Sequence, residues 1–234
     1  LDSYDVMGED FRSNYVLGLD ARAASGDDVE MYQAYIEAKD LYGTALSLRV
    51  GRQEIQLGSE WLVGNNDKNS FFTGLSFDAI RLDYATDMFS VTALASKLAE
   101  TFGDFADNDA DLYGIYASYL GIEDVTIDAY WLWVRDRVAH IGTESDLHTV
   151  GLRGAGTIGA FDFDAEVAYQ FGEAEFPDTK FLWWTVDDND LDYDAWACNL
   201  EAGYTFDVSY QPRVFLGFAY LEGASDDSLA FNRL

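Results

Sequence analysis

The sequence is poor in cysteine, proline, basic residues and long apolar runs, and each shortage excludes a class of protein. The single cysteine, Cys198, rules out an intrachain disulfide and a thiolate metal cage. Two prolines and no Ser/Gly-rich stretch favour one continuous domain over residues 1–234. With 14 Lys and Arg against 43 Asp and Glu, the chain lacks the basic surface that nucleic acids require. No apolar run reaches the ~18 residues that a transmembrane helix needs.

The composition nevertheless predicts a folded chain. Apolar residues make up 49% of the sequence and aromatic residues 16%, which is too much for an acidic disordered protein. The net charge of -29 must therefore lie on exposed segments. Cys198, with Trp196 and Leu200 on the same face of a predicted strand, is interpreted as a small apolar filler.

Apolar and polar residues alternate along segments of about ten residues, which is the period of a strand whose two faces meet different surroundings. Residues 160–171 show this most clearly: Phe161, Phe163 and Val167 fall on one face, and Asp162 and Glu166 on the other. Eleven strands are predicted in this way, at about 14–23, 29–39, 44–56, 75–85, 88–98, 111–121, 125–136, 147–157, 160–171, 195–206 and 212–221.

Short and long connections alternate between these strands. Tight turns are expected near 40–43, 86–87, 121–124, 158–160 and 207–211, and longer polar loops at 57–73, 99–110, 137–146 and 172–194. Short periplasmic turns and long extracellular loops are typical of a transmembrane antiparallel up-and-down β-barrel. The all-β class and a location in the bacterial outer membrane are therefore predicted; the alternative is a soluble all-β domain with an aromatic core.

In hydrocarbon every backbone N–H and C=O must be paired within the protein, which a sheet achieves by closing into a barrel. The apolar face of the closed sheet then contacts lipid, and the polar face lines water. Tyrosine and tryptophan near strand ends suit the interfacial girdles of such a barrel; these residues are Tyr84, Tyr119, Trp133, Tyr169, Tyr204 and Tyr220. Since bacterial barrels have an even number of strands and the sequence ends without a terminal aromatic residue, the 11–12 strands are expected to form part of a larger barrel, with strands missing at the C-terminal end at least.

Several short motifs resemble the alginate export family of outer-membrane proteins over residues 14–234. One is Val50-Gly51-Arg52-Gln53-Glu54-Ile55, followed by Gly58, Trp61, Leu62 and Gly64; another is Phe77-Asp78-Ala79-Ile80-Arg81-Leu82. The remaining motifs are His148 to Arg153, Tyr193 to Trp196 running into Gly203 to Phe206, Pro212 to Gly217, and Phe231-Asn232-Arg233.

The resemblance implies a monomeric barrel of about eighteen strands, of which this chain would be an incomplete part. It also implies transport of a polyanionic polysaccharide through an arginine-rich lumen. Strand parity then places four arginines in the lumen, Arg49, Arg81, Arg153 and Arg213, with Gln53 beside them. Arg52 breaks this parity, so a bulge or a strand end is expected there.

The predicted lumen face departs from that pattern because seven acids share it: Glu37, Asp83, Asp128, Asp162, Asp164, Glu166 and Glu201. Fixed charge along a narrow aqueous path sets ion preference, so a mixed lumen suits cations, small solutes or a neutral sugar at least as well as a polyanion. The expected pore-lining and selectivity residues are Arg49, Gln53, Arg81, Asp83, Asp128, Arg153, Asp162, Asp164, Glu166, Glu201 and Arg213.

Other residue clusters have weaker functional interpretations. Asp187, Asp188, Asp190 and Asp192 offer hard oxygen ligands for weakly bound calcium, but no EF-hand spacing surrounds them and a solvated acidic loop is favoured; no other cofactor is expected. His140 and His148 lack a nucleophile motif near Ser145, so no enzyme is predicted.

Two clusters bear on lipid contact and on the pore. Arg135 and Arg137 suit either lipopolysaccharide phosphates or an interfacial salt-bridge cluster, and the cluster is favoured. Trp183 and Trp184 suit either stacking on sugar rings or a loop packed inward as a pore constriction, and the packed loop is favoured.

Two functions are carried forward. The first is an outer-membrane channel of the alginate-export type, which passes a solute or polysaccharide and contacts lipid and lipopolysaccharide. The second is a structural or interaction barrel that houses or anchors a periplasmic or surface protein.

Overall fold

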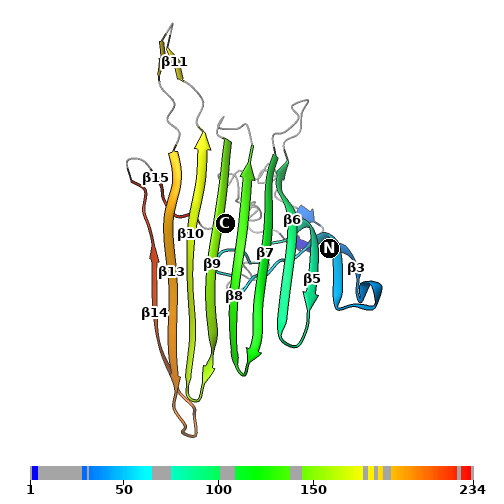
Figure 1. Ribbon diagram of the computed structural model, residues 1–234, viewed down its shortest axis with the longest axis vertical. Helices are drawn as coiled ribbons and strands as arrows, with labels where there is room; N and C mark the ends of the chain where they lie inside the picture. The colour runs from blue at the N-terminus through cyan, green and yellow to red at the C-terminus, as the bar shows by residue number, and fades with distance from the viewer. Residues whose placement is uncertain are drawn as a thin grey trace.

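The computed structural model describes residues 2–4, 28–30, 32–64, 75–100, 109–137, 144–175, 179–181, 184–186, 191–225 and 228–232. Its centre is one antiparallel up-and-down sheet in which each strand pairs with its neighbours along the chain (Figure 1). The strands, in chain order, are β3 Ala34–Ala38, β4 Leu46–Gln53, β5 Phe77–Ala85, β6 Phe89–Glu100, β7 Asp109–Ile122, β8 Val125–Asp136, β9 Glu144–Ile158, β10 Phe161–Glu175, β13 Leu191–Thr205 and β14 Arg213–Leu221.

Short elements complete the fold. β15 (Ser228–Leu229) adds to β13 in parallel, which makes the sheet eleven-stranded. β1 (Asp2–Tyr4) pairs with β2 (Asp28–Glu30), β11 (Thr179–Phe181) pairs with β12 (Trp184–Val186), and η1 (Leu41–Gly43) is a single 3-10 turn between β3 and β4. Within the described residues, no helix has both the length and the apolar character needed to cross a membrane.

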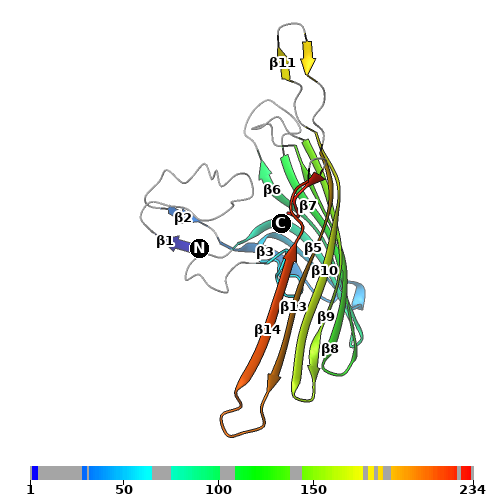
Figure 2. The same ribbon diagram turned by 90° about the vertical axis from the view of Figure 1, so that its left-hand side faces the viewer.

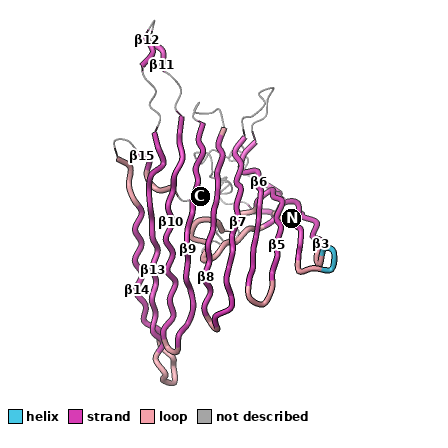
Figure 3. The backbone as a smooth tube through the Cα atoms, viewed as in Figure 1, coloured by secondary structure: helices cyan, strands magenta, loops and turns pink. Residues whose placement is uncertain are grey.

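The predicted all-β, antiparallel up-and-down class is confirmed, although the sheet is not closed within the described residues: β3 and β14 are its two edges. Short turns join the strands at one end of the sheet (Figure 3). Parts of each of the longer loops predicted at 57–73, 99–110, 137–146 and 172–194 lie outside the described residues. β9, β10 and β13 each have 15 residues and extend further toward the long connections than predicted. The strand predicted at 14–23 lies outside the described residues.

The two faces of the sheet differ as the alternation predicts. Strand register places directly paired residues on the same face; on the outer face this row runs through Ile80, Trp133 and His148. Large apolar side chains on this face remain exposed, among them Leu152, Val167 and Phe218. The six predicted girdle residues all lie on this outer face. The opposite, inner face is the one around which the sheet curves (Figure 2).

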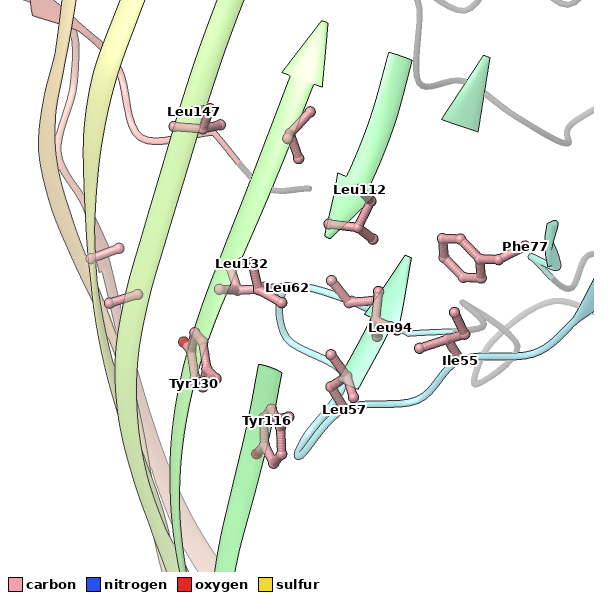
Figure 4. Close-up of a cluster of buried hydrophobic side chains, with 14 of the residues drawn as sticks. Ile55, Leu57, Leu62, Phe77, Leu94, Leu112, Tyr116, Tyr130, Leu132 and Leu147 are labelled. Atoms are coloured by element: carbon pink, nitrogen blue, oxygen red, sulfur yellow. The ribbon is translucent and has the colours of Figure 1, made fainter. Parts of the chain in front are cut away.

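The hydrophobic core lies on the inner face, because two segments of the chain fold back over it. Residues 54–64, which follow β4, place Ile55, Leu57, Leu62 and Val63 against inward side chains of β6, β7 and β8 (Figure 4). The described residues 222–225 and 228–232, which follow β14, bring Phe231 to the same cluster. We call these the inner segment (54–64) and the C-terminal segment (222–232).

Candidate functional site

The part of the inner face nearest the short turns carries a network of ion pairs, and Arg153 on β9 lies at its centre. Its Nη1 is 2.8 Å from Asp128 on β8, and its Nε and Nη2 bind Asp164 on β10 at 2.9 and 2.6 Å. The Asp128 side chain is 2% exposed and that of Arg153 13%. Fork-like contacts of this kind fix a guanidinium between two carboxylates, so the charge of Arg153 is fully matched within the wall.

The other three inward arginines are paired in the same way. Arg49 binds Glu37 at 2.7 Å, and Arg81 binds Asp83 at 2.9 Å. Arg213 on β14 binds Glu201 at 2.6 Å and reaches across β13 to Asp162 at 3.0 Å.

Gly203 makes the long reach of Arg213 possible. A Cβ at this position would lie 2.6 Å from both Arg213 Nε and Asp162 Oδ1. Any side chain on β13 here would therefore separate the arginine of β14 from the aspartate of β10.

Glu166 differs from the other six inward acids because, within the described residues, it binds hydroxyl groups and no basic side chain. It accepts hydrogen bonds from Tyr130 at 2.8 Å and from Ser59 of the inner segment at 3.0 Å. Gly58, next to Ser59, has φ +56, and a Cβ there would lie 2.3 Å from the Tyr116 hydroxyl. Glycine is therefore required for the inner segment to approach the wall this closely.

The inner segment is held mainly by apolar burial. Ile55 is fully buried, and Leu57, Leu62 and Val63 are 4–8% exposed. Each such side chain contributes about 1.5–3 kcal/mol when buried, and the bond from Ser59 to Glu166 adds about 1 kcal/mol. Displacing the segment would cost several kcal/mol, so it is a fixed part of the wall.

The C-terminal segment is recognised by a buried glutamine of β10. Gln170 is fully buried; its Oε1 accepts from Asn232 N at 2.7 Å and its Nε2 donates to Asn232 O at 2.7 Å. Its amide thus pairs with the backbone of Asn232 as a neighbouring strand would. Phe231 stacks on Trp61 of the inner segment, with ring centroids 6.0 Å apart, so the two segments contact each other over the wall.

This contact gives a first prediction. Gln170→Leu removes the amide and leaves the backbone of Asn232 unpaired, at a cost of about 1–3 kcal/mol. Limited proteolysis of the folded protein in detergent should then cleave residues 222–232 faster than in the wild type, while the strands stay resistant. Gln170→Glu, which keeps the acceptor for Asn232 N, should be cleaved at an intermediate rate. Equal cleavage of all three proteins would refute this role of Gln170.

All eleven residues expected to line a pore lie on the inner face. Ten are members of the ion pairs and hydrogen bonds described above, and Gln53 is fully buried at the end of β4, where it donates to Ala79 O at 3.0 Å. Arg52 needs no bulge: it is next to the last residue of β4, faces outward and binds Asp78 in a fork of 2.9 and 2.6 Å. Whether these inward residues line an open path stays a prediction.

Sequence reasoning missed the residues that hold the two segments, namely Ser59, Gln170 and Phe231. The sequence did contain a signal for the inner segment. The loop predicted at 57–73 is polar, yet it includes the apolar residues Leu57, Leu62 and Val63, which indicate that this part of the loop packs against the protein. The predicted inward loop was a different one. Its Trp183 lies outside the described residues, and the β11–β12 hairpin, which includes Trp184, projects beyond the end of the sheet (Figure 1).

The outer face carries a second cluster of ion pairs. It lies next to the row of aromatic rings formed by Tyr113, Trp133, His148 and Phe171. Arg137 binds Asp146 and, at 3.1 Å, Glu144; Lys97 binds Asp109 at 2.6 Å and Asp111 at 2.7 Å. Arg135 lies 3.9 Å from Asp111. Arg135 and Arg137 thus form the salt-bridge cluster favoured from the sequence, and its position at the membrane interface stays a prediction.

The remaining candidates from the sequence lie apart from the inner face. His148 stacks with Trp131, Trp133 and Phe171 on the outer face, and His140 lies outside the described residues. Asp187, Asp188 and Asp190 also lie outside them, while Asp192 is on the outer face opposite Glu173. Calcium at the acidic loops therefore stays a prediction.

The comparison with known families decides the assignment. The sequence profile described as alginate export matches residues 5–232, nearly the whole chain. The chain belongs to the alginate export family. This is a family of outer-membrane β-barrels with a transport function, so alginate-export membership makes the chain an outer-membrane channel protein in general terms and implies polysaccharide passage. Among the curated proteins, none matches the chain.

Proposed function

We propose that this alginate-export family member is a channel of the bacterial outer membrane whose lumen prefers cations and neutral solutes over polyanions. The proposal rests on one observation: each of the four inward arginines is bound to inward carboxylates. An arginine that is already paired offers little attraction to a passing anion.

The balance of charge on the inner face supports the same preference. Seven named carboxylates share the face with four arginines, and Glu166 is bound only to hydroxyl groups in the described wall. Close to a low-dielectric wall, three excess negative charges raise the local concentration of cations. A polyanionic polysaccharide would meet net repulsion along this side of the lumen.

The test is single-channel recording from the full-length protein in a planar bilayer, with the reversal potential measured under a salt gradient. We expect stable conductance and a reversal potential on the cation-selective side. Anion selectivity would contradict the proposed lumen and favour export of a polyanion. The triple variant Glu37→Gln, Asp83→Asn and Glu201→Gln should shift the reversal potential toward zero or beyond, because it removes three inward carboxylates.

A second function has one observation in its favour. The inner face toward the long connections is apolar and covered by the inner and C-terminal segments, as expected of a barrel that houses a partner rather than conducts. Absence of conductance from correctly folded protein would support this structural or interaction role, with a periplasmic or surface protein as partner. Lipid and lipopolysaccharide are proposed contacts of the outer face in either case.

A further inference from the structure

The outer face carries an apolar band whose height can be followed strand by strand. On β10 the outward residues from Phe161 to Phe171 are apolar, and on β13 those from Trp196 to Phe206. Ten steps along each strand at ~3.3 Å per residue, tilted by ~40°, give a band about 25 Å high. This is the height that outer-membrane barrels present to lipid.

The band is much lower at the other side of the sheet. On β5 the outward apolar residues are Ile80, Leu82 and Tyr84, and the next outward residue toward the long connections is the charged Asp78. On β4 they are Leu46, Leu48 and Val50, and the next outward residue is Arg52. In each case four steps along the strand, from the first to the last of these apolar residues, give a band about 10 Å high by the same geometry. β6 and β7 are intermediate: their outward apolar residues span six steps along the strand, which gives about 15 Å.

Charged side chains mark the upper limit of the low band. Arg52 and Asp78 form a forked pair on the outer face, and Lys97, opposite Asp78 in the next strand, binds Asp109 and Asp111. Outward charges are costly at the bilayer midplane and tolerated near the interface. This row therefore lies at the level of lipid head groups.

From β13 to β3 the strands shorten together with the band, whereas β14 on the opposite edge has 9 residues. β13 and β10 have 15 residues, β5 has 9, β4 has 8 and β3 has 5. The hairpin ends at the short-turn side rise progressively from β13–β14 to β3–β4 (Figure 1). The upper limit of the apolar band, marked by the charged row, and its lower limit, at the hairpin ends, thus come closer together toward β3.

We infer that the bilayer is locally thinned where it meets the β3–β5 flank. This inference rests on the proposed membrane function. Lipid is the occupant to which the flank is suited, because its outward residues are apolar and exposed, Ile36 at 80% and Ile80 at 55%, and continue the full-height band of β9–β13. A short apolar surface is matched by thinning the surrounding bilayer.

Depth measurement with nitroxide labels tests the inference. In a Cys198→Ala background, Asp78→Cys and Val167→Cys each place a label six residues from the lower border, Tyr84 on β5 and Phe161 on β10. In vesicles of a C18 phosphatidylcholine, the accessibility to oxygen and to a nickel chelate should place the Val167 label among acyl chains and the Asp78 label at head-group level. Equal acyl depth for both labels would overturn the inference. A Val167 label in water would instead refute the membrane-embedded outer face itself.

A compensating variant gives a second test. Arg52→Leu with Asp78→Leu removes both partners of the pair and raises the low band, so the folded yield in C18 vesicles should increase by about twofold or more, with no gain in C12 vesicles. The control is Glu173→Leu with Asp192→Leu, a directly opposed outer pair above the full-height band, which should give no gain. If Arg52→Leu with Asp78→Leu gives no gain in C18 vesicles, the thinned-bilayer inference is wrong. A dimer cross-linked through Ile80→Cys in the bilayer would also overturn it, because a second copy of the chain would then cover the flank in place of lipid.

Discussion

Replacing Arg153 with alanine is expected to lower the free energy of unfolding by about 3–5 kcal/mol, the range for removing one partner of a buried ion pair. The variant leaves Asp128 and Asp164 close together without their cation. Asp128 suffers most, because its side chain is 2% exposed and its Oδ1 has no hydrogen-bond partner among the described residues. Urea unfolding of the full-length protein in detergent, followed by tryptophan fluorescence, measures the loss.

Two further variants separate this cause from a general loss of packing. Asp128→Asn in the Arg153→Ala background should recover part of the stability, since a neutral amide is less costly to bury than an unpaired carboxylate. Arg52→Ala, which breaks the exposed pair with Asp78, should cost only about 0–1 kcal/mol. If Arg153→Ala costs no more than Arg52→Ala, the inner network is not buried as described.

The two-residue period of the strands explains why the faces were predictable from sequence. Once a strand is recognised, parity alone assigns Asp128, Arg153 and Glu166 to one face. The period does not say which acid each arginine binds, since that depends on register between strands. Arg153 and Asp128 are 25 residues apart, and they meet because the β8–β9 register places them opposite each other.

The inner segment could not be predicted in the same way. Ile55 and Leu57 keep the two-residue spacing of β4, but Leu62 and Val63 do not continue it. The cluster that the four anchors join draws side chains from strands between β5 and β13 that are far apart in sequence. The contact of Gln170 with Asn232 joins residues 62 positions apart through backbone atoms, which carry no sequence signal at Asn232. Tertiary packing, rather than local pattern, decides the structure of both segments.

Because apolar packing holds the inner segment in place, substitutions that weaken this packing should change the conductance more than other substitutions in the wall. Ile55→Ala with Leu57→Ala removes two of the four buried anchors at about 2–5 kcal/mol each, a loss comparable to the stabilisation that Leu62, Val63 and the bond from Ser59 to Glu166 still provide. We expect residues 54–64 to leave the wall while the strands stay paired. Single-channel conductance should then rise, because the cross-section beside β6–β8 is no longer occupied.

Ile115→Ala with Leu152→Ala is the matched control, since it removes the same groups from outward residues of β7 and β9 that are 48% and 59% exposed. It should leave the conductance unchanged, because neither residue contacts the inner face. An Ile55→Ala, Leu57→Ala variant that is less stable yet conducts like the wild type would place the inner segment outside the conducting path. Raised conductance with the cation preference retained would show that the segment limits the width of the path, whereas the paired charges near the short turns set its selectivity.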